Sequence, residues 1–267
     1  MKIVCVIPAR YKSSRFEGKP LQDICGKPMI WWVYQEAKKV QDYDRVIVAT
    51  DDQRIIDACD RYGMDSMMTS ENHPTGTDRV AEVAQKVPAD LYVIVMGDEP
   101  LIQAGDEQKL IDSISKDENA DAVMLTEKFV NPVDVVNTTT IKLAINNQHE
   151  LLYMSRTPIP YPKASLGFQY YKNVGCYALK QEALDFFLKT APGCIEEAEE
   201  IELLRLLEHR KKVLTVLVDS ASMSVDTPKD LERIRMIIAS RQNGGGTRHR
   251  HINTFHAARL FEMEAAA

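Results

Sequence analysis

A loop rich in cations and hydroxyl groups follows the first apolar segment of the chain. Residues 8–20, PARYKSSRFEGKP, combine Arg10, Arg15 and Lys19 with Ser13 and a glycine in one short stretch. Backbone N–H groups, hydroxyls and cationic side chains are the groups that bind a triphosphate. The loop lacks the GK[ST] of a Walker A motif and the G-x-G-x-x-G of a dinucleotide-binding turn. A phosphate-binding loop and a solvated basic loop both fit this composition.

Two aspartates lie where strands are expected to end. Asp98 belongs to the motif GDEP, directly after an apolar run, and Asp226 belongs to VDTP, before a helical stretch. Mg²⁺ prefers one or two carboxylates together with phosphate oxygens. Each aspartate on its own also fits the capping of a following helix. A metal site requires the fold to bring Asp98 and Asp226 together, which their spacing cannot show.

Two further segments carry groups suited to an anion. HPTGTDR, residues 73–79, is a turn that opens a helix, and the N–H groups there suit an anion or a base edge, with plain capping as the alternative. YMSRTPIPY, residues 153–161, ends a strand in a turn constrained by prolines. Arg156 in this turn could grip a substrate carboxylate or form a surface salt bridge.

Short apolar segments alternate with amphipathic ones along the first half of the chain. Strands are predicted at 2–7, 45–49, 91–96 and 122–126. Helices are predicted at 28–40, 53–62, 78–87 and 107–116. This alternation predicts an α/β fold with a parallel, doubly wound sheet. Such sheets bind ligands at the carboxyl ends of their strands, which is where the basic loop and Asp98 stand.

The pattern changes from Glu127 onward. Antiparallel strands are predicted at 139–145 and 150–155 around an Asn-Asn turn, with a further strand at 170–178. We interpret residues 127–180 as an inserted arm within a domain that spans 1–242. Helices at 182–188, 197–209 and 228–240 and a strand at 213–218 complete that domain. Three glycines and a histidine-bearing segment that ends in three alanines predict a non-native tail over 243–267, with a natural C-terminal helix as the alternative.

The composition of the whole chain excludes several classes of protein. A formal net charge of −6 and a pI near 5.6 argue against a generic nucleic-acid binder. No apolar run approaches the roughly 20 residues that a membrane span needs, and MKIVCVIPAR is charged too early for a signal peptide. The five scattered cysteines show no CxxC spacing, which predicts reduced, buried thiols and a cytoplasmic location.

Taken in order, these motifs resemble those of the CMP-KDO synthetase (3-deoxy-manno-octulosonate cytidylyltransferase) family. The matching segments are IPARYKSSRFEGKPL, GKPMI, VATDD, HPTGTDR, GDEPLI, YMSRTPIPY, VGCYAL and VDTPKDLE. The resemblance implies a Rossmann-like, mostly parallel sheet with an inserted antiparallel dimerisation arm, a homodimer and Mg²⁺ as cofactor. It also implies the reaction of CTP with the acidic sugar KDO to give CMP-KDO and pyrophosphate, in the service of lipopolysaccharide or capsule synthesis.

The resemblance assigns roles to residues at matching positions. The CTP phosphates would be held by Arg10, Ser13, Arg15 and Lys19, with Ala9, Thr77 and Arg79 near the nucleotide. Mg²⁺ would be bound by Asp98 and Asp226, and the sugar acid would face Arg156, Asn173, Tyr177 and Glu202. The expected catalytic set is Arg10, Lys19, Asp98 and Asp226. With Mg²⁺ they would neutralise the charge that develops as the anomeric hydroxyl attacks the α-phosphorus.

Three positions depart from the residues that the family usually has near the acceptor. Met96 and Leu203 each replace a glutamine, and Asn173 replaces a histidine. A thioether cannot make the paired hydrogen bonds of an amide, and losing such a partner changes acceptor discrimination. KDO therefore stands beside an 8-amino KDO, another 2-keto-3-deoxy acid or a phosphonate as the expected acceptor. Use of UTP, and a catalytically inactive nucleotide-binding relative, are broader alternatives.

Overall fold

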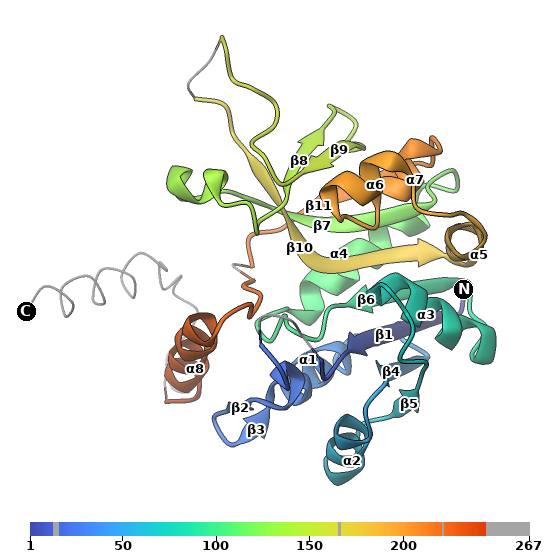
Figure 1. Ribbon diagram of the computed structural model, residues 1–267, viewed down its shortest axis with the longest axis vertical. Helices are drawn as coiled ribbons and strands as arrows, with labels where there is room; N and C mark the ends of the chain where they lie inside the picture. The colour runs from blue at the N-terminus through green and yellow to red at the C-terminus, as the bar shows by residue number, and fades with distance from the viewer. Residues whose placement is uncertain (13–15, 165–166, 221, 244–267) are drawn as a thin grey trace, which may run out of the picture.

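A nine-stranded mixed sheet forms the centre of the protein (Figure 1). The structure is a computed structural model that describes residues 1–12, 16–164, 167–220 and 222–243. Ser13, Arg15 and nearly all of the predicted tail therefore lie outside the described residues. The strand order is β11-β7-β10-β6-β1-β4-β5, and β8 and β9 join the sheet through β10.

Four strands form the parallel part of this sheet. They are β1 (Ile3–Ala9), β4 (Arg45–Thr50), β5 (Ser66–Met68) and β6 (Leu91–Val95). Every residue of β1 and β6 is buried, which explains their continuous apolar, β-branched sequences. A second parallel pair, β7 (Ala122–Lys128) and β11 (Val213–Leu217), lies at the other edge. The predicted α/β fold with a mostly parallel sheet is confirmed.

β10 (Tyr171–Lys180) runs antiparallel between β6 and β7 and joins the two parallel parts. We expected residues 127–180 to form an arm, but this last strand of the stretch lies inside the main sheet. The hairpin of β8 (Lys142–Ile145) and β9 (Leu151–Ser155) pairs with the start of β10 and projects from the sheet (Figure 1). A 3₁₀ helix, η2 (Pro132–Val136), lies in the connection from β7 to β8.

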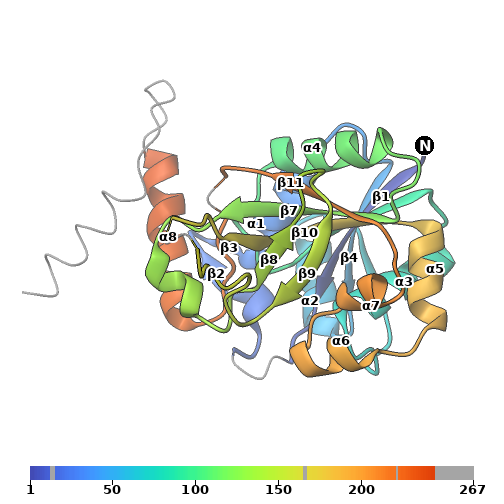
Figure 2. The same ribbon diagram turned by 90° about the horizontal axis from the view of Figure 1, so that it is seen from above.

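Helices cover both faces of the sheet (Figure 2). One face is covered by α1 (Met29–Ala37), α2 (Gln53–Arg61) and α4 (Ala104–Ser115). The other is covered by α3 (Gly76–Lys86), α5 (Gln181–Lys189) and α7 (Leu204–Glu208). Alternate residues of β1 point into the two layers, with Cys5 and Ile7 in one apolar cluster and Val4 and Val6 in the other.

Two elements differ from the prediction. The single helix expected at 197–209 is wrong, because α6 (Cys194–Glu199) and α7 are separate helices. Glu200 adopts a left-handed conformation with a φ of 51°, which ends α6. A short hairpin of β2 (Asp23–Ile24) and β3 (Lys27–Pro28), not predicted, packs with the closing helix α8 (Pro228–Asn243).

The cysteines of the described chain carry free thiols. Cys5, Cys59 and Cys176 are buried, as predicted, but Cys25 and Cys194 are exposed, which corrects the expectation of buried thiols throughout. Among the described helices, none is both long enough and apolar enough to cross a bilayer.

Candidate active site

The carboxyl ends of β1 and β6 lie side by side at one edge of the sheet. Gly97 follows β6 and makes this approach possible, because a Cβ atom there would lie 2.9 Å from the backbone oxygen of Pro8. Ala9, the last residue of β1, pairs with Thr50 at the end of β4. The loop after β1 and the turn that contains Asp98 are therefore neighbours, as the strand-end rule predicts.

The basic loop after β1 turns back on itself through a left-handed glycine. Gly18 has a φ of 67°, and its N–H donates to the Tyr11 carbonyl at 2.8 Å. The guanidinium of Arg54 stacks 3.2 Å from the centre of the Tyr11 ring, which fixes the outer side of the loop. A short 3₁₀ helix, η1 (Lys19–Leu21), begins directly after Gly18 and directs Lys19 inward. Ser13 and Arg15 belong to this loop but lie outside the described residues.

Lys19 meets both of the predicted metal ligands. Its Nζ atom lies 2.5 Å from Asp98 Oδ2 and 4.0 Å from Asp226 Oδ1. The backbone brings the aspartates together, because the N–H of Val225 donates to the Asp98 carbonyl at 2.9 Å. The side chains of Asp98 and Asp226 remain 21% and 28% exposed, so a ligand from solvent can reach them. Three groups from distant parts of the sequence thus form one cluster at the strand ends.

The N-terminus of α3 is already capped by protein groups. Thr75 Oγ1 accepts the Asp78 N–H, and the Glu202 carboxylate accepts those of Gly76 at 3.1 Å and Thr77 at 3.0 Å. The structure shows the capping alternative for residues 73–79, and a role of these residues toward an anion or a base edge stays a prediction. Burial raises the pKa of Glu202, while the bonds from Thr77 and Gly76 lower it.

Tyr177 joins this cap to the centre of the sheet. Its hydroxyl lies 2.9 Å from Thr77 Oγ1, and burial raises its pKa well above the ordinary value. Thr77 was expected near the nucleotide, and Tyr177 and Glu202 near the acceptor. The structure brings these three residues together at the start of α3.

Arg79 is a fully buried cation one turn further along α3. Its guanidinium pairs with Asp51 at 3.0 Å and also donates to Thr69 and to the Ser70 carbonyl. Burial lowers the pKa of Arg79; Asp51 opposes this effect, and the charge of Arg10 adds to it. Arg10, at the start of the basic loop, is exposed. The Nε atom of Arg79 has no hydrogen-bond partner within the described structure.

Arg156 makes protein contacts at the end of β9. Its guanidinium donates to three backbone carbonyl groups: Glu199 at 2.7 Å, Glu200 at 3.2 Å and Thr138 at 3.4 Å. These bonds join β9 to the end of α6, a few residues before Glu202. The predicted role of Arg156 toward a substrate carboxylate stays a prediction.

The three departures from the family pattern occupy different environments. Leu203 is buried in the core at 5% exposure, so its side chain packs against protein. The Met96 methyl lies 3.9 Å from where a Cβ of Gly76 would stand, and the Glu202 carboxylate lies at the same distance from that point. Asn173 stands on β10 opposite Thr126. Met96 is thus the substitution that borders the cap of α3.

Sequence reasoning missed two buried acids close to this cluster. Glu99, next to Asp98, is 5% exposed, and its carboxylate accepts bonds from Gly175 and Ser222. Burial raises its pKa to about 7, and the charge of Asp98 adds to the effect. Glu127, at the end of β7, is equally buried and pairs with Lys172 at 3.0 Å. The only signal in the sequence was the second acid of GDEP, because the partners of both residues are distant along the chain.

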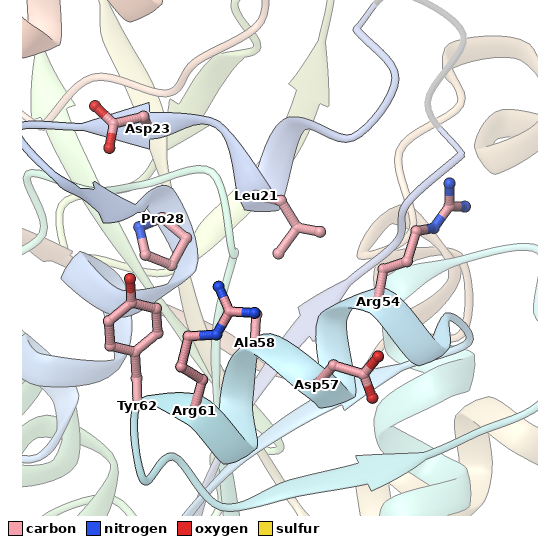
Figure 3. A pocket seen from close by; sticks show the side chains of 8 residues that line it. All are labelled: Leu21, Asp23, Pro28, Arg54, Asp57, Ala58, Arg61 and Tyr62. Carbon is pink, nitrogen blue, oxygen red and sulfur yellow. The ribbon is translucent and has the colours of Figure 1, made fainter.

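A separate open pocket of about 400 Å³ lies between α2 and the β2–β3 hairpin (Figure 3). It is lined by Leu21, Asp23, Pro28, Arg54, Asp57, Ala58, Arg61 and Tyr62. Arg54 also stacks on Tyr11, so the pocket borders the outer side of the basic loop. Neither Asp98 nor Asp226 lines it, and the acidic cluster with Lys19 remains the candidate site.

Comparison with known proteins agrees with this geometry. Residues 4–213 match the family described as Cytidylyltransferase. A 3-deoxy-manno-octulosonate cytidylyltransferase of Escherichia coli is 40% identical over 238 residues, which are 89% of this chain and 96% of that protein. One from Fusobacterium nucleatum is 37% identical over 235 residues, 88% of this chain and 96% of its own. The solved structure of a CMP:2-keto-3-deoxy-manno-octonic acid synthetase complexed with CTP is 39% identical, with a TM-score of 0.86, and the match covers 90% of this chain and all of that one.

Proposed function

This chain belongs to the cytidylyltransferase family, and we propose that it transfers CMP from CTP to the anomeric hydroxyl of KDO and releases pyrophosphate. The observation that carries the proposal is the meeting of Lys19 with Asp98 and Asp226 at the carboxyl ends of the strands. A lysine at this position can bind the phosphates of a nucleotide triphosphate, and the two carboxylates can bind the metal ion that accompanies it.

The residues of this cluster fit Mg²⁺. Asp98 and Asp226 offer hard carboxylate oxygens, both are partly open to solvent, and both lie within 4.0 Å of one cation. Asp98 and Asp226 would hold the ion together with the substrate phosphates. When bound, Mg²⁺ neutralises phosphate charge and orients the triphosphate for in-line displacement.

The other residues position the triphosphate and balance its charge. Lys19 would leave its ion pair with Asp98 to bind phosphate oxygens, and Arg10 would add a second cation from the start of the loop. The anomeric oxygen forms a bond to the α-phosphorus as the bond from that phosphorus to the bridging oxygen breaks. Pyrophosphate leaves with the bridging electrons, and the hydroxyl proton passes to solvent.

A modified acceptor is the second candidate, and Met96 is the observation that favours it. Its thioether borders the Glu202 cap, and it cannot exchange hydrogen bonds with sugar hydroxyls as an amide can. An 8-amino KDO or a phosphonate would use the same CTP half of the site.

We also propose that the protein works as a homodimer. Val130, Val133 and Val136 are at least two-thirds exposed around η2, and Tyr161 is 84% exposed in the connection from β9 to β10. A bond from the Phe129 N–H to the Tyr170 carbonyl at 3.0 Å joins these two connections. Exposed apolar side chains around η2 support an interface on this surface, and a second copy of the chain is the occupant we propose.

Pyrophosphate release measures the proposed reaction directly. The purified protein is assayed with Mg²⁺, each of the four NTPs and a panel of acceptors that contains KDO, 8-amino KDO and a phosphonate. Turnover with CTP and KDO above all other pairs is the expected result. Preference for UTP would refute the cytidylyl half, and preference for another acceptor would refute KDO alone.

A further inference from the structure

The segment between β11 and α8 carries Asp226 without any regular secondary structure in its described residues. Asp226 nevertheless stands within reach of Lys19, on the same side as Asp98. The hydrogen bonds of a helix or strand do not fix the path of this segment. Other contacts therefore have to hold Asp226 in place.

Ser222 ties this segment to the sheet at two points. It is buried, with 6% exposure, and both of its hydrogen-bonding donors are used. Its N–H donates to Glu127 Oε1 at 2.9 Å, and its hydroxyl donates to Glu99 Oε2 at 2.6 Å. Glu127 belongs to β7 and Glu99 to the turn after β6, so a single serine connects the segment to two different strands.

Glu99 is held from its other side by a bulge in β10. The pairing of β10 with β7 shifts register between Asn173 and Tyr177, and Gly175 lies in this interval. The Gly175 N–H donates to Glu99 Oε1 at 3.1 Å. A Cβ at Gly175 would lie 2.7 Å from the same oxygen, so the glycine leaves room for the carboxyl group.

Glu127 on β7, which lies on the other side of β10 from β6, also binds this segment. It accepts the Ser220 hydroxyl at 3.0 Å and pairs with Lys172 of β10 at 3.0 Å. Ser220 thus shares Glu127 with Ser222 but has no bond to Glu99. This difference provides a matched control within one loop.

We propose that Ser222 and Glu99 are positioning residues that set the separation of Asp98 and Asp226 for a shared Mg²⁺. Glu99 directly follows Asp98 in the chain. Val225, which donates to the Asp98 carbonyl, directly precedes Asp226. The Ser222–Glu99 bond therefore closes a short ring that includes the Asp98 carbonyl and Val225, and Asp226 is attached directly to this ring through Val225. This inference rests on the proposed metal-binding role of Asp98 and Asp226.

Mn²⁺ binding provides a test that does not depend on turnover. Electron paramagnetic resonance would measure free Mn²⁺ in the presence of CTP, without acceptor, for wild type, Ser222→Ala and Ser220→Ala. Ser222→Ala is expected to weaken Mn²⁺ binding about tenfold, as loss of a group behind a metal ligand typically does, and Ser220→Ala by less than about twofold. Equal losses in the two variants would show that Ser222 acts only on general stability, and would overturn the proposal.

Hydrogen exchange tests the same ring in metal-free protein. In Ser222→Ala the amides of residues 222–227 are expected to exchange about tenfold faster than in wild type, because the segment loses its tie to Glu99. In Ser220→Ala they are expected to stay close to wild type. Unchanged exchange in Ser222→Ala would contradict the positioning role.

Glu99→Gln is the second variant, and it keeps the size of the side chain. The Glu99 carboxylate accepts from Gly175 at one oxygen and from Ser222 at the other, and glutamine replaces one of these oxygens with an NH2 donor, so the present pair of bonds cannot form unchanged. It is expected to weaken Mn²⁺ binding about as much as Ser222→Ala, and it decides the question if the alanine variant does not fold. Wild-type affinity in Glu99→Gln would overturn the proposal. If the wild-type protein binds no Mn²⁺, both the metal assignment and this inference are refuted. If it binds Mn²⁺ but does not turn over KDO, only the proposed acceptor is refuted.

Discussion

The Nζ atom of Lys19 lies 2.5 Å from Oδ2 of Asp98, so the cation expected to bind phosphate and the carboxylate expected to bind metal compensate each other. Both side chains are only 15% and 21% exposed. An unpaired charge at such depth would be costly. We infer that each of these two groups serves as the partner of the other until Mg²⁺ and CTP provide them with separate partners.

Removing the charge of Asp98 should abolish most of the activity. Asp98→Asn keeps the size of the side chain but weakens it as a ligand for a hard cation, and kcat/KM is expected to fall by about 100-fold or more. Pyrophosphate release over a series of CTP concentrations at saturating acceptor, repeated at several Mg²⁺ concentrations, measures the effect. The matched control is Asp112→Asn, an exposed aspartate on α4, which should stay near wild type. Full turnover in Asp98→Asn would show that this carboxylate does not serve the metal.

Glu202→Gln separates two roles for the same residue. If Glu202 serves mainly to cap α3, the change should raise the KM for CTP several-fold through Thr77 and Arg79, and leave the acceptor KM unchanged. Glu208 caps α6 in the same way, through the N–H groups of Ile195 and Glu196. Glu208→Gln should therefore cost a similar free energy of unfolding, about 1 kcal/mol, without changing either KM. A change confined to the acceptor KM in Glu202→Gln would favour the role implied by the family resemblance.

The sequence was most informative about site residues that lie at the carboxyl ends of strands. The alternation of apolar strands and amphipathic helices predicted the parallel sheet, and the sheet placed Lys19 and Asp98 at neighbouring strand ends. Asp226 could be anticipated only as one of two possibilities, because its approach depends on a bond between Val225 and Asp98.

The features that escaped prediction depend on contacts between distant residues. Glu202 and Thr77 are 125 positions apart, so the sequence could not show that the Glu202 carboxylate caps the N-terminus of α3. β10 carries an ordinary strand pattern, and nothing in that pattern gives its reversed direction between β6 and β7. Glu200 has no glycine-like signal, yet it ends α6 in a left-handed conformation. Local composition cannot report any of these features.

A charge placed in the exposed apolar group around η2 should disrupt the proposed dimer. Val133 is 72% exposed, and Val133→Asp would bury a carboxylate if this surface forms the interface. The dimer dissociation constant is expected to rise by about 100-fold or more. Sedimentation velocity over a range of concentrations measures it. Met236→Asp, at an exposed apolar position on α8, is the control and should leave assembly unchanged. A wild-type protein that sediments as a monomer at every concentration would refute the interface.

Glu107 should make the protein less stable as pH rises toward neutrality. It is a fully buried residue of the first turn of α4, where Tyr43 donates to Oε2 at 2.7 Å and Oε1 has no partner within the described structure. Burial raises its pKa to about 7; Tyr43 opposes this shift, and the charges of Glu36 and Asp106 add to it.

The sign of the effect follows from proton binding. Between the ordinary pKa of 4.5 and about 7, the folded state holds a proton on Glu107 that the unfolded state has lost. The stabilisation is complete below the lower value and disappears as pH rises through the upper one. Glu99, whose pKa is also raised to about 7, contributes a slope in the same direction. Glu107→Gln keeps an acceptor for Tyr43 and removes one titrating group, so the decrease in Tm between about pH 5 and pH 8 should be smaller than in wild type by a few degrees. Calorimetry on both proteins over this pH range tests the prediction, and Glu118→Gln, at an exposed position, is the control. An identical pH dependence of Tm in Glu107→Gln and wild type would show that Glu107 is ionised in the folded state throughout this range.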